Sequence, residues 1–189
     1  MRIIAGEARG RTLLAPKGQD TRPTQDYVRE SLFNIIQQSV PEARVLDLFA
    51  GSGALALEAL SRGAERAALV DCSTDAIQCI QRNAETLGFS KRASIIRADW
   101  QAALLRLAGN GERFTLVFID PPYRMTETGT QCAKLADINL LENNALVLIE
   151  HRRDVTPSLD DRFTAVDQRR YGDTVIHFYR YLGGKNSDE

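Results

Sequence analysis

Short uninterrupted apolar runs alternate with longer segments of helical periodicity between residues 43 and 150. Uninterrupted runs of this kind are typical of strands that are covered on both faces, as in a parallel sheet. Segments in which an apolar residue recurs every three or four positions are typical of amphipathic helices. The alternation therefore predicts right-handed strand–helix–strand units and a parallel sheet between two layers of helices. The predicted strands are 43–49, 66–71, 93–99, 114–120 and 145–150, and the predicted helices are 54–63, 73–89, 101–109 and 127–136.

Both ends of the chain show a different pattern. Apolar residues lie on either side of a Gly-Asp turn at 172–173, which predicts a C-terminal antiparallel hairpin. Near the start, two apolar bursts separated by Gly and Arg predict a small β-hairpin over 2–16, and a helix follows from the N-cap Thr24 to Pro41. We therefore expect a seven-stranded, mostly parallel α/β fold, with an N-terminal extension at 1–24, a main domain at 25–182 and a flexible tail at 183–189.

The composition fits a folded protein without membrane spans. Apolar residues make up 43% of the 189 residues and the net charge is −1, which argues against disorder. No apolar run approaches the roughly 20 residues of a membrane helix, and the first residues lack the apolar core of a signal peptide. The cysteines, Cys72, Cys79 and Cys132, form no C-x-x-C pair and lie far from both histidines. We therefore expect no metal site and reduced thiols in a cytoplasmic protein.

Arginine dominates the basic residues. Of the 24 basic residues, 20 are Arg, which suits bidentate phosphate contacts and base stacking better than Lys does. The first 24 residues carry five basic and two acidic residues, a net charge of +3. The N-terminus is therefore expected to face an anionic partner.

Acidic residues end four of the predicted strands: Asp47, Asp71, Asp99 and Asp120. The carboxyl ends of parallel strands meet at one edge of a sheet, and such folds bind their ligands there. Acids can also cap the helices that follow, but this would explain only one or two of the four. We therefore predict a ligand site at this edge.

A glycine turn follows the first of these strands, within Val45–Leu60. Gly51 and Gly53 allow the backbone to approach a ligand closely, and with Ala56 they also fit the dinucleotide pattern G-x-G-x-x-A. Asp47 discriminates between two candidate cofactors. A carboxylate repels the pyrophosphate of NAD at a helix N-terminus, but it attracts the ammonium and sulfonium groups of S-adenosylmethionine. The turn therefore favours S-adenosylmethionine.

Two later strand ends would complete a nucleoside pocket. Asp71 can accept both hydroxyls of a ribose, a group that both cofactors contain. Asp99 can accept from an adenine amine, and Trp100 can pack on the adenine ring. A tryptophan at this position can also be a core or helix-start residue.

The fourth strand ends in the sequence VFIDPPYR, at 117–124. An exocyclic base amine is a poor nucleophile because its lone pair is delocalised into the ring. The Asp120 carboxylate and the Pro121 carbonyl can accept its two N–H groups, and Pro121 with Pro122 stiffens the corner. Tyr123 offers a ring for stacking on an unpaired or flipped base. The tip therefore predicts methyl transfer to an exocyclic amine.

These motifs resemble those of a known family. D-x-F-x-G-S-G followed by D-P-P-Y resembles the class I, Rossmann-like methyltransferases that modify exocyclic amines with S-adenosylmethionine. The segments R-I-I-A-G and R-G-R at 2–11, T-R-P-T at 21–24, L-F-N-I at 32–35, E-A-L-S-R-G-A at 58–64 and Y-G-D-T at 171–174 are similar to bacterial 16S ribosomal RNA guanine-N2 methyltransferases of the RsmD type. This resemblance covers residues 2–181 and implies a monomeric enzyme that methylates N2 of one guanine in the small ribosomal subunit or an assembly intermediate.

The resemblance also implies roles for individual residues, in three groups. For the cofactor S-adenosylmethionine it implies Asp47, Phe49, Gly51, Gly53, Asp71, Asp99 and Trp100. For the target base it implies Asp120, Pro121, Pro122 and Tyr123. For the RNA it implies Arg2, Arg9, Arg11, Arg22 and Thr24.

Three other functions fit parts of the pattern. A DNA or RNA adenine or cytosine amino-methyltransferase shares the D-P-P-Y tip, but a duplex reader normally needs a target-recognition segment, and the loop after Tyr123 runs only to about residue 130. An NAD-dependent oxidoreductase fits the glycine turn, but Asp47 and the D-P-P-Y tip argue against it. A non-catalytic RNA-binding module would not need both motifs intact.

Overall fold

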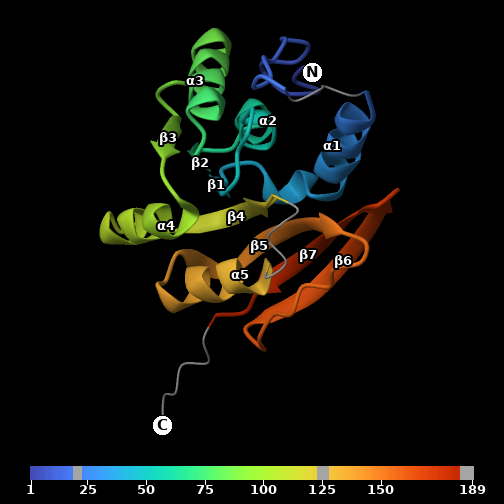
Figure 1. The fold of residues 1–189 in the computed structure, drawn as a ribbon, viewed down its shortest axis with the longest axis vertical. Helices are drawn as coiled ribbons and strands as arrows, with labels where there is room; N and C mark the ends of the chain where they lie inside the picture. Colours follow the sequence, from blue (N-terminus) through green and yellow to red (C-terminus); the bar gives the residue numbers. More distant parts are fainter. Residues whose placement is uncertain (19–22, 123–127, 184–189) are drawn as a thin grey trace.

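The computed structural model describes residues 1–18, 23–122 and 128–183. Seven strands form one sheet (Figure 1): β1 (Arg44–Asp47), β2 (Arg66–Asp71), β3 (Ala93–Arg97), β4 (Phe114–Ile119), β5 (Leu141–Arg152), β6 (Phe163–Tyr171) and β7 (Thr174–Tyr181). Their order is β3-β2-β1-β4-β5-β7-β6. The first five strands are parallel, and β7 pairs antiparallel with β5 and β6. The predicted mostly parallel sheet with a C-terminal hairpin is therefore confirmed.

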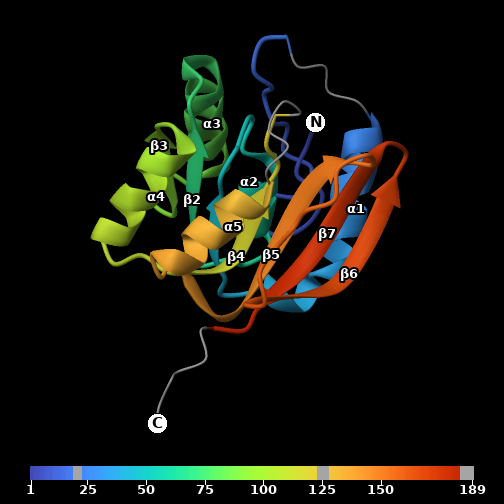
Figure 2. The same ribbon diagram turned by 60° about the horizontal axis from the view of Figure 1, so that its bottom comes forward.

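Helices cover both faces of this sheet (Figure 2): α1 (Pro23–Ile35), α2 (Ala54–Ser61), α3 (Thr74–Leu87), α4 (Trp100–Gly109) and α5 (Thr128–Asp137). Alternate residues of a strand face opposite layers. In β4, Leu116 and Phe118 belong to a core cluster shared with α1, α2 and α3, while Val117 and Ile119 belong to a second cluster shared with α4 and α5. Burial on both faces explains why the strands are continuous apolar runs.

The ends of α3 are the predicted ones. The Ser73 side chain is the N-cap and accepts from the backbone N–H of Ala76 over 3.3 Å. Gly88 ends the helix in the left-handed region, with φ of 77°, where a glycine avoids the steric cost of a Cβ.

The ends of α1 differ from the prediction. The helix begins at Pro23, so Thr24 lies inside the first turn and is not the N-cap residue. Proline suits the first helical position because its φ is fixed and no N–H partner is needed there. The helix ends at Ile35, and a separate 3₁₀ turn, Gln37–Ser39, fills the stretch that was predicted to be helical up to Pro41. The apolar residues Ile36 and Val40, on either side of this turn, are buried in the first core cluster, so the apolar spacing continues beyond the end of the helix.

The N-terminal segment, residues 1–14, forms the predicted hairpin only in part. One antiparallel bridge joins Arg2 to Thr12, and the backbone N–H of Gly10 donates to Ile3 over 2.8 Å. Ile3 and Leu13 are buried in the first core cluster. Core contacts therefore hold this segment together with a few cross-strand hydrogen bonds.

A buried carboxylate of α2 fastens the first turn of the segment. Glu58 is fully buried, and its two oxygens accept from the backbone N–H groups of Ile4 at 2.8 Å and Ala5 at 3.0 Å. Arg62 pairs with the same carboxylate at 2.7 Å and Arg29 at 3.8 Å. The charge of Glu58 is thus compensated inside the core, as a buried carboxylate requires.

A buried amide of α3 holds the end of the segment. The Asn83 side chain accepts from the Leu14 N–H at 2.8 Å and donates to the Leu14 carbonyl at 3.0 Å. Its amide nitrogen also donates to the Ser52 carbonyl, in the turn after β1, at 3.0 Å. One side chain therefore joins the N-terminal segment to the glycine turn.

β5 is longer than the predicted strand 145–150. It begins at Leu141, beside Phe114, and its register with β4 shifts before Leu146. Asn144, in this irregular part, has φ of 65°. The extra residues include two exposed asparagines, so the apolar pattern gives no sign of them.

Within residues 1–18, 23–122 and 128–183, no helix has the length and apolar character needed to cross a membrane. All three cysteines are free thiols, with Cys79 and Cys132 buried and Cys72 exposed. The predicted flexible tail lies, from residue 184 on, outside the described residues.

Candidate active site

Two carboxyl residues, Asp120 and Glu150, lie on adjacent strands: Asp120 directly follows β4, and Glu150 lies in β5 two residues before its end. In the parallel register of these strands, Phe118 lies beside Leu148, and the next pair of residues continues the alignment. Phe118 and Leu148 both belong to the first core cluster. Asp120 lies two positions after Phe118, and Glu150 lies two positions after Leu148. The period of two in a strand places both acids on that same face.

Two further carboxylates reach this edge from β1 and β2. Asp47 lies beside Leu69 in β2 and beside Phe118 in β4, and Asp71 follows two positions after Leu69. None of the four strand-end acids on this face, Asp47, Asp71, Asp120 and Glu150, forms a salt bridge within the described ranges. These carboxyls have no compensating cation, so a cationic ligand that stabilises their ionised forms is favoured at this edge.

Asp47 is the most deeply buried of the four. It is only 2% exposed, and its Oδ2 accepts a long hydrogen bond of 3.4 Å from the backbone N–H of Ala56, in the first turn of α2. Burial raises the pKa of the Asp47 carboxyl to about 7, and the negative charge of Asp71 adds to the rise. Near neutral pH this carboxyl is therefore poised to lose a proton when a cation approaches.

Asp71 holds the glycine turn in place. Its Oδ2 accepts from the Gly51 backbone N–H over 2.9 Å, and its Oδ1 accepts from the Ser73 N–H over 2.8 Å. The residue is half-buried, and each carboxylate oxygen keeps a second lone pair for a ligand. Asp71 thus anchors the loop and can also accept hydrogen bonds from ribose hydroxyls.

The turn itself requires glycine at two positions. Gly51 has φ of 56° and Gly53 has φ of 78°, and residues other than glycine rarely adopt such positive φ values. A Cβ on Gly53 would also come within 3.0 Å of the Leu69 side chain. Phe49, just before the turn, is partly buried against the second core cluster.

Asp99 and Trp100 follow β3 at the same edge. The Asp99 side chain caps α4, and its Oδ1 accepts from the Gln101 N–H at 2.9 Å. Trp100 is 8% exposed and packs in the second core cluster. Helix capping and core packing, both left open by the sequence, therefore account for these contacts, and Asp99 is an exposed residue.

The corner after β4 presents Asp120 to solvent. Asp120 and Pro122 are exposed, Pro121 is buried, and Tyr123 lies outside the described residues. Loss of solvation raises the pKa of the Asp120 carboxyl well above its usual range, and the charges of Glu150 and Asp47 raise it further. The corner therefore combines an accessible carboxylate with a fixed proline backbone.

Glu150 is the site residue that the sequence reasoning missed. It is half-buried, and burial raises the pKa of its carboxyl. The signal was present, because the predicted strand 145–150 ends in an acid just as the other four do. Because it lies next to Asp120, Glu150 belongs to the same cluster of acidic residues.

The predicted RNA-contacting arginines lie at the N-terminus. Arg2, Arg9 and Arg11 are exposed, and the Arg11 guanidinium donates to the Thr86 carbonyl at the end of α3. Arg22 lies outside the described residues. Exposed guanidinium groups on a segment fastened to α2 and α3 can meet a phosphate backbone without reorganising the core.

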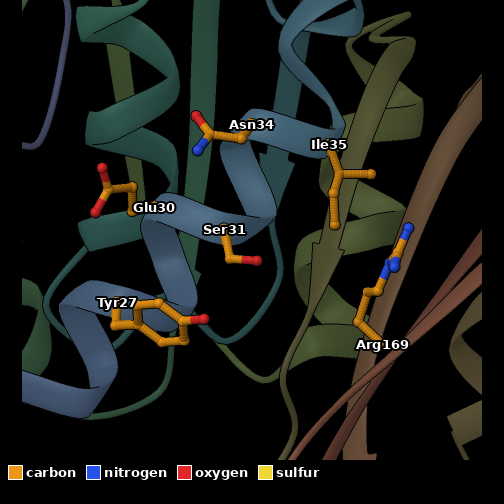
Figure 3. Close-up of a pocket in the computed structure, with 6 residues that line it drawn as sticks. All are labelled: Tyr27, Glu30, Ser31, Asn34, Ile35 and Arg169. Atoms are coloured by element: carbon orange, nitrogen blue, oxygen red, sulfur yellow. The ribbon is translucent and has the colours of Figure 1, made fainter.

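A separate groove of about 560 Å³ lies between α1 and β6 (Figure 3). Tyr27 on its wall is 65% exposed. None of the four strand-end carboxylates lines the groove, so it is distinct from the candidate site. Its lining residues are Tyr27, Glu30, Ser31, Asn34, Ile35 and Arg169.

The chain matches a family and several solved structures over most of its length. The pattern of the family described as Conserved hypothetical protein 95 matches residues 1–180. Ribosomal RNA small subunit methyltransferase D of Escherichia coli (strain K12) is 40% identical over 150 residues, which is 79% of this chain and 74% of that one. The structure of yhhF from Escherichia coli has a TM-score of 0.86 and 33% identity, and covers 97% of this chain and 99% of that chain.

A more distant structure shows the same fold. The structure of SMU.776 complexed with SAH has a TM-score of 0.68 at 17% identity and covers 85% of this chain and 50% of that chain. The glycine turn, the strand-end acids and the D-P-P-Y corner thus occur in a chain with full-length methyltransferase relatives. The chain belongs to the RsmD family of class I methyltransferases, which act on small-subunit ribosomal RNA.

Proposed function

We propose that this protein transfers a methyl group from S-adenosylmethionine to the exocyclic N2 amine of one guanine in 16S ribosomal RNA. The observation that carries the proposal is the position of Asp120. Its accessible carboxylate stands at the carboxyl end of β4, beside the β1 end that leads into the glycine turn. Donor and acceptor sites therefore adjoin at one edge of the sheet.

The residues at this edge fit S-adenosylmethionine. Asp47 and the turn of Gly51 and Gly53 would hold its cationic methionine end, Asp71 its ribose, and Asp99 its adenine amine. Bound there, S-adenosylmethionine supplies a methyl group on a sulfonium. Four carboxylates without a salt-bridge partner would repel a pyrophosphate, which argues against NAD.

The corner after β4 suits an amine acceptor. The Asp120 carboxylate and the Pro121 carbonyl would accept the two N–H groups of the amine, which directs the nitrogen lone pair at the methyl donor. The prolines hold these acceptors in place, so no reorganisation is needed during transfer. Tyr123 would stack on the base.

The N-terminal arginines would position the RNA. Arg2, Arg9 and Arg11, together with Arg22 and Thr24, would contact phosphates near the target. Since the chain as a whole carries a net charge of −1, recognition would also depend on the folded small subunit or an assembly intermediate. We expect the enzyme to act in the cytoplasm as a monomer.

The decisive experiment incubates the protein with radiolabelled S-adenosylmethionine and small ribosomal subunits from a strain that lacks this activity, followed by nucleoside analysis. Label in N2-methylguanosine that forms much more slowly with Asp120→Ala supports the proposal. Label in a methylated adenosine or cytidine would favour the other amino-methyltransferases. Absence of label with subunits and with assembly intermediates would overturn it.

A further inference from the structure

Glu150 is a carboxylate at the reaction edge to which the proposed methyl transfer gives no task. It ends the apolar part of β5, is half-buried, and makes no salt bridge or side-chain hydrogen bond within the described part of the chain. A partly buried carboxylate without a partner is costly to retain. Such a group invites the question of which ligand atom it serves.

The strand register places Glu150 next to the amine-binding corner. Ile119 lies beside Ile149, so Asp120 and Glu150 are the next residues on two adjacent parallel strands. Neighbouring strands are about 4.8 Å apart, and the charge of Glu150 acts on Asp120. Two acceptors at this spacing match two neighbouring donors on one edge of a flat base.

The bases differ in what lies beside their exocyclic amine. In guanine, the ring nitrogen N1 next to the 2-amino group carries a hydrogen and is a donor. In adenine and cytosine, the ring nitrogen next to the amine carries no hydrogen and is an acceptor. An ionised carboxylate at this position therefore pairs with guanine and repels the other two bases.

We propose that Glu150 is a specificity-determining residue that accepts the N1–H of the target guanine, while Asp120 accepts the adjacent N2 amine. The inference rests on the proposed guanine-N2 activity and extends it, because it assigns base choice to a residue outside the D-P-P-Y corner. Amine activation and base selection are thus divided between two strands.

A base analogue separates this role from a structural one. 2-Aminopurine keeps the 2-amino group but has an unprotonated N1. Once the target position has been mapped, small subunits are reconstituted with 16S RNA that carries guanine or 2-aminopurine at that position. The ratio of kcat/KM for guanine to kcat/KM for 2-aminopurine is then measured for each enzyme.

The wild-type enzyme should prefer guanine by at least ~100-fold, since a site built for a donor rejects an analogue that lacks it. In Glu150→Gln the neutral amide can accept from N1–H or donate to an unprotonated N1. The preference should therefore fall by ~10-fold or more, through lower activity on guanine and higher activity on 2-aminopurine.

Glu142→Gln is the matched control, because Glu142 lies on the same strand at the opposite end, where it pairs with Arg44 at 2.7 Å. It should leave the preference unchanged. Loss of the O6 atom in 2-aminopurine affects all variants alike and cancels in the comparison. Glu150→Asp keeps the carboxylate acceptor and should retain the preference for guanine. It is the variant to measure if Glu150→Gln does not fold.

The two proposals fail in different ways. If the wild-type enzyme methylates no guanine N2, the proposed function is wrong. If it does, and Glu150→Gln loses activity on both bases equally with the preference intact, the assignment of Glu150 is overturned while the function stands.

Discussion

The backbone N–H of Gly51 donates to the carboxylate of Asp71 over 2.9 Å, so the end of β2 holds the glycine turn that follows β1. Asp71 also accepts from Ser73 at the start of α3. One carboxylate thus fixes the two backbone segments that would flank the ribose of a bound nucleoside. Loop geometry and ligand binding at this edge depend on the same side chain.

Asp71→Ala should weaken binding of S-adenosylmethionine by ~10- to 100-fold, because it removes the loop anchor and the ribose acceptor together. The turnover number at saturating cofactor should change much less. Isothermal titration calorimetry gives the affinity, and Asp75→Ala, an exposed acid in the first turn of α3, is the control. Unchanged affinity in Asp71→Ala would remove Asp71 from the cofactor site.

Asp120→Ala should lower kcat by ~100-fold or more and leave cofactor affinity nearly intact, because the lost acceptor acts mainly in the transition state. Asp120→Asn should keep more activity, since an amide oxygen still accepts one N–H. Single-turnover methylation of small subunits measures both. The exposed Asp161, changed to Ala, is the control, and a large loss of cofactor affinity in Asp120→Ala would contradict the assignment.

The raised pKa of Asp47 predicts how the stability of the free protein depends on pH. Folding raises this pKa from 3.8 to about 7, so the folded state keeps a proton that the unfolded chain loses in between. The contribution to the free energy of unfolding is complete below pH ~4 and is lost as pH rises through ~7, on the order of 4 kcal/mol in all. Urea unfolding at pH 5 and pH 8 should show a larger loss for wild type than for Asp47→Asn, by ~2 kcal/mol.

The same proton should leave when a cationic cofactor binds. Near pH 6.5 the binding of S-adenosylmethionine should release up to about one proton, because the positive ligand lowers the pKa of Asp47. Calorimetry in two buffers of different ionisation enthalpy measures this release. Asp47→Asn should release less, and equal release from both proteins would show that another group titrates.

Substitution of two glycines near the N-terminus would show how closely the first residues pack on α2. Gly6 and Gly10 have nearly equal φ values, 84° and 82°, but a Cβ on Gly6 would lie 1.8 Å from the Ser61 carbonyl oxygen while a Cβ on Gly10 meets nothing within 4 Å. Gly10→Ala should cost ~1 kcal/mol of unfolding free energy, from backbone strain alone. Gly6→Ala should cost at least ~2 kcal/mol more, through the clash. Equal losses in urea unfolding would show that the close contact is absent.

Strand-end acids show what the sequence could and could not predict. The continuous apolar runs located all five parallel strands. The rule that their carboxyl ends share one edge correctly predicted that Asp47, Asp71 and Asp120 lie at the same edge of the sheet. Glu150 follows the same rule but was passed over, because no motif marks it. Trp100 could be read as a ring for adenine or as a core residue, and only the packing of α4 shows that it is buried.

The early residues were harder to predict because their partners are distant in sequence. The Gly and Arg spacing suggests a regular hairpin, yet the backbone N–H groups of Ile4 and Leu14 bind side chains 54 and 69 positions away. A local pattern contains no information about such partners. The helix start at Pro23 was missed for a different reason, since Thr24 and the preceding proline both satisfy rules for a helix start.

These distant partners set an order of events during translation. Leu14 leaves the ribosome long before Asn83, which lies 69 residues later, and at roughly 5 to 20 residues per second the delay is about 3 to 14 s. Throughout this interval Leu14 lacks its side-chain partner, although Glu58 of α2, which binds the backbone N–H of Ile4, is synthesised before Asn83. The end of the segment that is synthesised first can thus reach its final position only after α3 has been made.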